Sequence, residues 1–264
     1  MRILFIGDIF GKPGRTMVKQ HLTEVVEQQR IDLIIANGEN AAGGFGITPQ
    51  IAEELFEQGI SVITTGNHVW DKREIIDYMQ QATNGQPARR LIRPANYPEG
   101  TPGYGFYQGK TSTGVPYAVI NLQGRVFLPS NDDPFRMADR LLQQITAKVI
   151  LVDVHAEATS EKVAMGWYLD GRVTAVLGTH THIPTADTRV LPKGTAFQTD
   201  IGMTGPYDSI IGVQKELVIQ RFLTNLPARW EPATGDPRFC GVVIECDPDT
   251  GRALSVERVM ICEN

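Results

Sequence analysis

The chain has 264 residues, of which 42% are hydrophobic and 21% are charged, and this composition excludes disordered, collagen-like and coiled-coil proteins. The net charge of −5 argues against extended nucleic acid as a partner, although it does not exclude a local site for one phosphate group. The three cysteines lack paired spacing, and no apolar run has the length of a signal peptide or a membrane span. We therefore expect a cytoplasmic protein without membrane contact, and its self-association stays open.

The first eighty residues alternate between strand and helix patterns. Short, nearly continuous apolar runs predict three buried strands, at residues 3–6, 32–37 and 61–65. Apolar residues spaced three and four apart predict a helix after each strand. The first helix is expected at residues 14–26, the second from Pro49 onward and the third after Asp71. We expect the Asp71 side chain to cap the third helix. The alternation indicates an α/β protein.

The rest of the chain is richer in strands. Six further strands are expected, at residues 104–107, 117–120, 148–154, 173–177, 239–245 and 253–260, with one helix at residues 134–145. Because the sequence contains no repeat, low-complexity block or Pro/Ser linker, we expect a single domain over residues 1–264. Periodicity alone leaves open whether the strands form one mixed sheet or two packed sheets flanked by helices.

Polar residues collect where the predicted strands end. Five strands are followed by potential ligands or acid/base groups, namely Asp8, Glu39 with Asn40, Asn67 with His68, His155, and His180 with His182. Taken singly, the acids are typical helix caps and the histidines typical loop residues. Four of the five histidines nevertheless fall in this set. Because ligands bind at the carboxyl edge of α/β sheets, we expect these residues to form one metal site.

The types of ligand atom restrict the metal. His180 and His182 are two residues apart, so an extended segment can turn both toward one site. Carboxylate and imidazole groups without any thiolate favour Mn, Fe or Zn over Cu(I) or an iron–sulfur cluster. The set is larger than one ion needs. Two ions roughly 3.5–4 Å apart, sharing a carboxylate, would use all of it and suit hydrolysis of a phosphate ester.

These motifs resemble a known family. Gly7-Asp8, Gly38-Glu39-Asn40, Gly66-Asn67-His68, His155 and the segment 178–182 are similar, in this order, to the motifs of the calcineurin-like metallophosphoesterases. The longer segments 7–11, 37–44, 153–162 and 199–205 resemble the YmdB-like bacterial subfamily. The resemblance implies a four-layer αββα sandwich, with two mixed sheets flanked by helices. It also implies phosphodiesterase activity on 2′,3′-cyclic nucleotides, with 3′,5′-cyclic nucleotides as a further substrate class to test.

The resemblance also implies a role for each site residue. One metal ion is assigned to Asp8, Glu39, Asn40 and His182, and Glu39 bridges to a second ion held by Asn67, His155 and His180. A hydroxide shared by the two ions attacks phosphorus in line. His68 corresponds to a position that does not bind metal, and its imidazole is the expected donor of a proton to the leaving ribose oxygen.

The sequence departs from the wider superfamily at two positions. Phe10 stands where a histidine is usual, and Glu39 replaces the usual bridging aspartate. The Asn40 amide oxygen is expected to take the place of the missing imidazole. Because an amide oxygen is a harder ligand than imidazole, Fe or Mn is preferred, with Zn as the alternative.

Several roles stay open in the sequence. Lys12 and Arg15 fit either phosphate attraction or a solvated helix start, and Phe45 fits either base stacking or a flexible glycine-rich loop. Asp71 could orient the His68 imidazole instead of capping a helix. Two alternative functions are also retained. One is hydrolysis of another phosphodiester or a phosphomonoester, such as RNA ends, and the other is a nucleotide- or RNA-responsive regulator with incidental catalysis.

Overall fold

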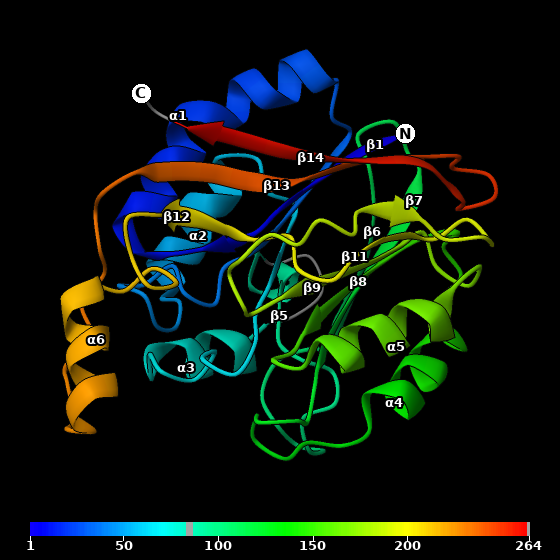
Figure 1. The fold of residues 1–264 in the computed structure, drawn as a ribbon. Coiled ribbons are helices and arrows are strands. Elements are labelled where there is room, and N and C mark those ends of the chain that lie inside the picture. The colour runs from blue at the N-terminus through cyan, green and yellow to red at the C-terminus, as the bar shows by residue number, and fades with distance from the viewer. Residues whose placement is uncertain (83–86, 263–264) are drawn as a thin grey trace.

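The computed structural model describes residues 1–82 and 87–262. Two mixed β-sheets pack against each other, and helices cover the outer face of each sheet (Figure 1). This is the four-layer αββα sandwich that the family resemblance implied, so the expected fold class is confirmed. The alternative of one continuous mixed sheet, which periodicity had left open, is excluded.

The first sheet is built from both ends of the chain. Its strands are β1 (Arg2–Ile6), β2 (Asp8–Ile9), β3 (Leu33–Asn37), β4 (Val62–Thr64), β5 (Leu91–Ile92), β12 (Met203–Pro206), β13 (Pro237–Cys246) and β14 (Ala253–Cys262). Their order is β2-β12-β13-β1-β3-β4-β5, with β14 paired to β13. β1, β3, β4 and β5 are parallel, whereas β13 is antiparallel to β1. The parallel strands therefore end at one edge.

The second sheet comes from the middle of the chain. Its strands are β6 (Phe106–Lys110), β7 (Pro116–Gln123), β8 (Val149–His155), β9 (Ala175–Thr179), β10 (Arg189–Val190) and β11 (Ala196–Gln198). Their order is β10-β11-β9-β8-β7-β6, with parallel pairing from β7 through β8 and β9 to β11. The central strand β8 is buried along its whole length, as its continuous apolar run predicts.

Helices form the two outer layers. They are α1 (Gly11–Gln29), α2 (Pro49–Glu57), α3 (Glu74–Gln80), α4 (Pro134–Leu142), α5 (Thr159–Leu169) and α6 (Lys215–Thr224), with a 3₁₀ turn at Pro87–Arg90. α2 and α4 begin with proline, preceded by the capping side chains of Thr48 and Asp133. α4 and α5 lie against the second sheet, and α6 stands at the side of the molecule (Figure 1).

The side chains of β1 show how the layers are held together. Ile3 and Phe5 point into a core between the two sheets, whereas Leu4 and Ile6 point into a core beneath α1 and α2. This alternation follows from the two-residue period of a strand. A third core joins the second sheet to α4 and α5. The central strands of each sheet are thus buried on both faces, which leaves the strand ends as the places where polar groups meet.

The expected strands and helices are present, with bounds shifted by a few residues. α5, α6 and the short strands β2, β5, β10, β11 and β12 were not predicted. The three cysteines are free, as expected, with Cys240 and Cys246 buried and Cys262 exposed. Within residues 1–82 and 87–262, no helix combines the length and apolar character that a membrane crossing requires.

Candidate metal centre and active site

The predicted site residues come together where the two sheets meet. Asp8 lies in β2 directly after β1, Glu39 and Asn40 follow β3, and Asn67 and His68 follow β4. From the second sheet, His155 ends β8, and His180 and His182 follow β9. The capping explanation for the acids is excluded, because α1 has no side-chain cap and α2 is capped by Thr48.

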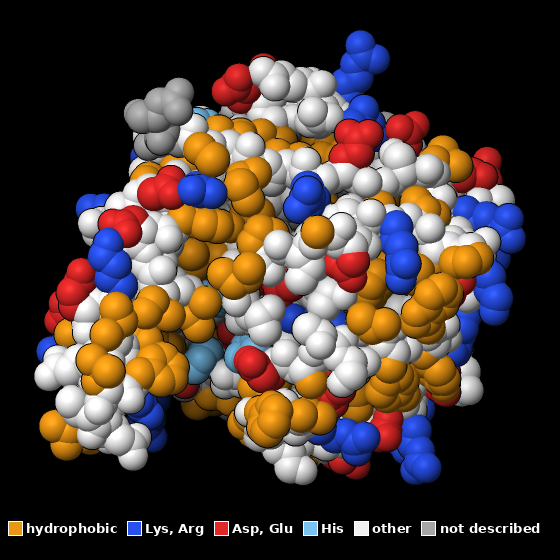
Figure 2. Space-filling model, in the orientation of Figure 1, with side chains coloured by type: hydrophobic (Ala, Val, Ile, Leu, Met, Phe, Trp, Pro, Cys, Tyr) orange, Lys and Arg blue, Asp and Glu red, His pale blue; other side chains and the backbone are white. Residues whose placement is uncertain are grey.

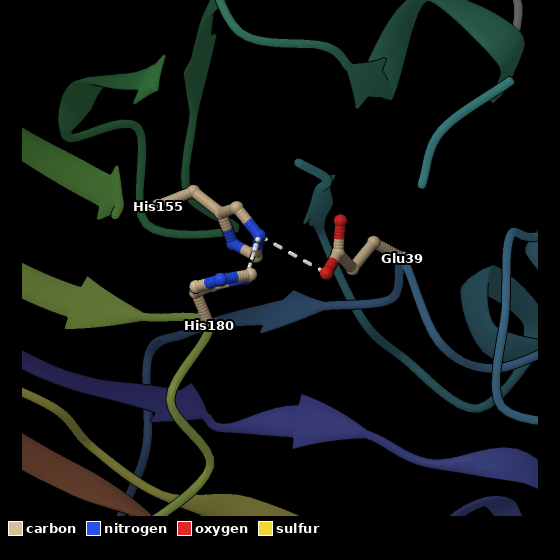
Figure 3. Close-up of side chains that lie close together, drawn as sticks. All are labelled: Glu39, His155 and His180. Carbon is tan, nitrogen blue, oxygen red and sulfur yellow. Dashed lines mark hydrogen bonds and ion pairs between the residues drawn. The ribbon is translucent and has the colours of Figure 1, made fainter. Parts of the chain in front are cut away.

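One group of ligand atoms surrounds His155. Its Nε2 atom lies 3.0 Å from Glu39 Oε1, 3.1 Å from Asn67 Oδ1 and 3.1 Å from His180 Nδ1. Figure 3 shows the His155, His180 and Glu39 side chains directed toward one another from both sheets. Ligand atoms of these three residues lie within 4.8 Å of one another, close enough to hold one cation.

A second group of possible ligands also contacts Glu39. The Asn40 amide nitrogen is 3.1 Å from His182 Nε2 and 3.2 Å from Glu39 Oε1. Asp8 Oδ1 is 3.8 Å from the same His182 nitrogen. Rotating the Asn40 amide by a half-turn exchanges its nitrogen and oxygen, which would present the oxygen to a cation. Glu39 therefore contacts both groups.

Hydrogen bonds fix which imidazole nitrogens face the site. His182 Nδ1 is 2.8 Å from the carbonyl oxygen of Ile211, which can only accept, so Nδ1 carries the proton. His155 Nδ1 donates to the Thr179 hydroxyl, because that hydroxyl donates its own proton to Asp153. Both Nε2 atoms therefore face the cluster. Partners of this kind orient metal-binding histidines.

Burial and neighbouring charges shift the pKa values of the acidic and histidine side chains in this cluster. Burial raises the pKa of Asp8 well above its ordinary value. Burial also opposes ionisation of Glu39, but the neighbouring His155 holds the pKa of Glu39 below its usual range. For His155, burial is outweighed by Glu39, which raises the pKa of the imidazole to about 9. Without a cation, His155 thus keeps a proton on the nitrogen that faces Glu39.

The side chains of the cluster suit a cation bound in place of the proton on His155 Nε2. Metal binding and protonation compete for the same lone pair of His155. Asp8 Oδ1 is buried and has no hydrogen-bond partner within the described residues. A buried carboxylate oxygen without a partner is costly unless a cation satisfies it. The carboxylate, amide and imidazole atoms are also the ligand types that Mn, Fe and Zn accept.

The backbone around the histidines is strained. The backbone φ angle is 94° at His180 and 66° at His182. Residues other than glycine rarely adopt this left-handed conformation. Gly66 permits the close approach of β4, since a Cβ atom there would collide with His155 and Glu39. Asp200 holds the strained segment, because its Oδ2 atom accepts hydrogen bonds from both the backbone and the hydroxyl of Thr181.

A buried ion pair supports this segment. Lys162 Nζ lies 2.8 Å from Asp200 Oδ2, and the two side chains are 1% and 0% exposed. Breaking such a pair by removing one partner leaves a buried charge uncompensated. We expect Lys162→Met to lower the free energy of unfolding, measured in urea, by about 3–5 kcal/mol. The double variant Lys162→Met/Asp200→Asn should recover much of the loss. A single variant as stable as the parent would contradict this role.

His68 stands at the edge of the cluster and is paired with Asp71. Its Nδ1 atom lies 2.9 Å from Asp71 Oδ2, while its backbone nitrogen donates to Glu39 Oε2. The prediction that Asp71 caps the third helix is wrong. α3 begins three residues later, after Arg73, and has no side-chain cap. The imidazole offers the carboxylate a stronger, charge-assisted partner than the helix start.

A pocket of about 590 Å³ opens onto the cluster. Its polar lining is Glu39, Asn40, His68, His180 and His182, and the rest of its lining is Phe10, Gly44, Phe45, Ile210, Ile211, Val213, Val218, Arg221, Phe222, Asn225 and Trp230. Its volume is in the range of small-molecule sites, about 300–1,000 Å³. The polar residues of this lining were predicted from the sequence. The wall from α6 was not, because it lies on a helix that the sequence pattern did not predict.

The residues with open roles now have positions. Arg15 donates to the carbonyl oxygen of Ala41 and so holds the loop after Asn40. Lys12 is exposed and lies outside the pocket lining. Phe45 packs edge-on against His68, with ring centres 5.0 Å apart. Phe10 is 2% exposed and packs edge-on against His182. A phosphate role for Lys12 or Arg15 gains no support from these positions.

The fold and the ligand atoms gathered around Glu39 define an α/β protein with a candidate cation site beside a small-molecule pocket. Residues 4–259 match the model of the family described as YmdB-like protein, and the chain belongs to this family. It is 52% identical to the 2′,3′-cyclic-nucleotide 2′-phosphodiesterase of Bacillus subtilis (strain 168), over 99% of this chain and 97% of that protein.

Two solved structures share the fold along the whole chain. A hypothetical protein from Thermus thermophilus is 44% identical and superposes with a TM-score of 0.92, covering 100% of both chains. A structure described as a novel phosphatase from Mycoplasma pneumoniae is 33% identical with a TM-score of 0.92, covering 100% of this chain and 94% of that one.

Proposed function

We propose that the protein is a metal-dependent phosphodiesterase that hydrolyses small cyclic nucleotides, with 2′,3′-cyclic nucleotides as the preferred substrates. The observation that carries the proposal is the pair of ligand groups joined by Glu39 at the base of a small-molecule pocket. The 52% identity to a 2′,3′-cyclic-nucleotide 2′-phosphodiesterase supports the substrate class.

Two cations would be held by the two groups. Asp8, Asn40 and His182 would bind one ion, Asn67, His155 and His180 would bind the other, and Glu39 would bind both. Fe or Mn suits these oxygen and imidazole ligands better than Zn, because an amide oxygen stands where an imidazole is usual. When bound, such ions ease deprotonation of the attacking water and stabilise charge on the phosphate.

The chain's own residues supply the remaining steps. Asp71 Oδ2 accepts a hydrogen bond from His68 Nδ1, which fixes the ring, so that Nε2 is the atom that can give a proton to the leaving ribose oxygen. The edge-on contact with Phe45 restricts the same ring from the side. His68 would thus act as the general acid.

A matched panel of substrates tests the proposal. Purified, metal-loaded protein is assayed with 2′,3′-cyclic AMP, 3′,5′-cyclic AMP and 3′-AMP, and kcat/KM is compared. We expect the 2′,3′-cyclic diester to have the highest kcat/KM. A preference for the monoester over both diesters would contradict the proposal and favour a phosphomonoesterase. No turnover of any of the three, together with micromolar nucleotide affinity, would favour a nucleotide-responsive regulator.

A further inference from the structure

The pocket has a second wall whose chemistry the hydrolysis step does not explain. α6 contributes Val218, Arg221 and Phe222 to it, and Asn225 follows at the C-terminal cap of the helix. Their spacing of three and four places them on one face of the helix. In Figure 2, the hollow between α6 and the body of the molecule contains histidine side chains at its base. The wall from α6 therefore faces the catalytic groups across the pocket.

This wall presents flat and apolar groups to the pocket. Phe222 is 80% exposed and Ile211 is 46% exposed. The Arg221 guanidinium lies over the Trp230 ring, 5.1 Å from its centre, an arrangement that holds both planar groups in place. Large apolar side chains exposed together in a concave site mark a ligand surface more often than a chance exposure.

We propose that this wall, made by Ile211, Arg221, Phe222 and Trp230, binds the nucleobase of the substrate by stacking and apolar contact. The inference rests on the proposed function, because it requires a phosphate held at the metal side of the pocket. In a cyclic nucleotide the base is one ribose away from the phosphate. A base has two flat faces that stack on aromatic side chains whatever its identity.

The wall predicts how the enzyme discriminates between bases. Stacking and apolar contact increase with the area of the ring system, so purines should bind more tightly than pyrimidines. The effect should lie in KM rather than kcat, because contacts to the base are the same in the ground state and in the transition state.

Two substrates that differ only in the base test the inference. They are 2′,3′-cyclic AMP and the 2′,3′-cyclic phosphate of 1-O-methyl ribose, which has a methoxy group in place of adenine. For the parent protein, we expect kcat/KM to be at least about 10-fold higher for the nucleotide, the range of one base–aromatic stack. Phe222→Ala should lower this ratio by about 10-fold, through a higher KM for the nucleotide.

Leu223 supplies the matched control. It follows Phe222 on α6, is 81% exposed and lies outside the pocket lining. Leu223→Ala should leave the ratio at the parent value. If Phe222→Ala leaves the ratio unchanged, or if the parent hydrolyses both compounds equally well, the base site is wrong although the proposed function stands. If the parent hydrolyses neither compound, the proposed function itself fails.

Discussion

Glu39→Ala should abolish turnover and reduce the content of both metal ions, while the protein stays folded. Glu39 is the carboxylate that contacts both ligand groups, because its Oε1 atom lies near both His155 and Asn40. Removing it takes away the shared ligand and the negative charge that balances two cations. Metal analysis of purified protein, with circular dichroism as the check on folding, measures the effect.

Asp8→Asn is the matched control for Glu39→Ala. Asp8 Oδ1 lies beside one ligand side chain, that of His182, while Oδ2 accepts a hydrogen bond from the His180 backbone. The change keeps the size of the side chain while removing its charge. It should weaken one metal position and leave the position at Asn67, His155 and His180 occupied. Two bound ions and near-parent activity in Glu39→Ala would show that Glu39 is not shared.

His68→Ala should lower kcat by about 10²- to 10⁴-fold without loss of metal. The ring lines the pocket but lies outside the group of ligand atoms around Glu39. A substrate with a better leaving group, such as a p-nitrophenyl phosphodiester, needs less proton donation and should lose less activity. Equal losses with good and poor leaving groups would point to positioning of the phosphate instead of general acid catalysis.

Asp71→Asn provides a graded version of the same test. It keeps a hydrogen-bond acceptor near His68 Nδ1 but removes the negative charge of the carboxylate, which strengthens that hydrogen bond. The loss in kcat should have the same direction as in His68→Ala and a smaller size, again without loss of metal. If His68→Ala lowers kcat but Asp71→Asn keeps the parent kcat, the contact between His68 and Asp71 is not needed for catalysis.

Much of the fold and the polar half of the site could be predicted from the sequence. Continuous apolar runs such as Ile3–Ile6 mark buried parallel strands, and in such sheets the residues that follow each strand meet at one edge. That rule alone brought Asp8, Glu39 and His155 together. The division into two sheets came from the family resemblance, since a strand pattern does not say which sheet it joins. The single domain, the cytoplasmic location and the role of each site residue stay predictions.

The parts that the sequence did not reveal depend on contacts between distant residues. Asp153 lies within a buried apolar strand, and only its approach to Thr179 shows that it orients His155. The sequence left Asp71 open between capping a helix and orienting His68, and only the distance between the two side chains decides for His68. Phe222 lies on α6, a helix that was not predicted, and it lines the pocket only because the folded chain brings α6 beside the site.

Anomalous X-ray scattering from crystals of protein purified without chelators or affinity-column metals tests the central claim most directly. Two peaks are predicted per chain, both beside Glu39. One should lie next to Asp8, Asn40 and His182, and the other next to Asn67, His155 and His180. A single ion at either group, or metal-free protein that hydrolyses cyclic nucleotides at the rate of the metal-loaded form, would contradict a phosphodiesterase that works with two metals.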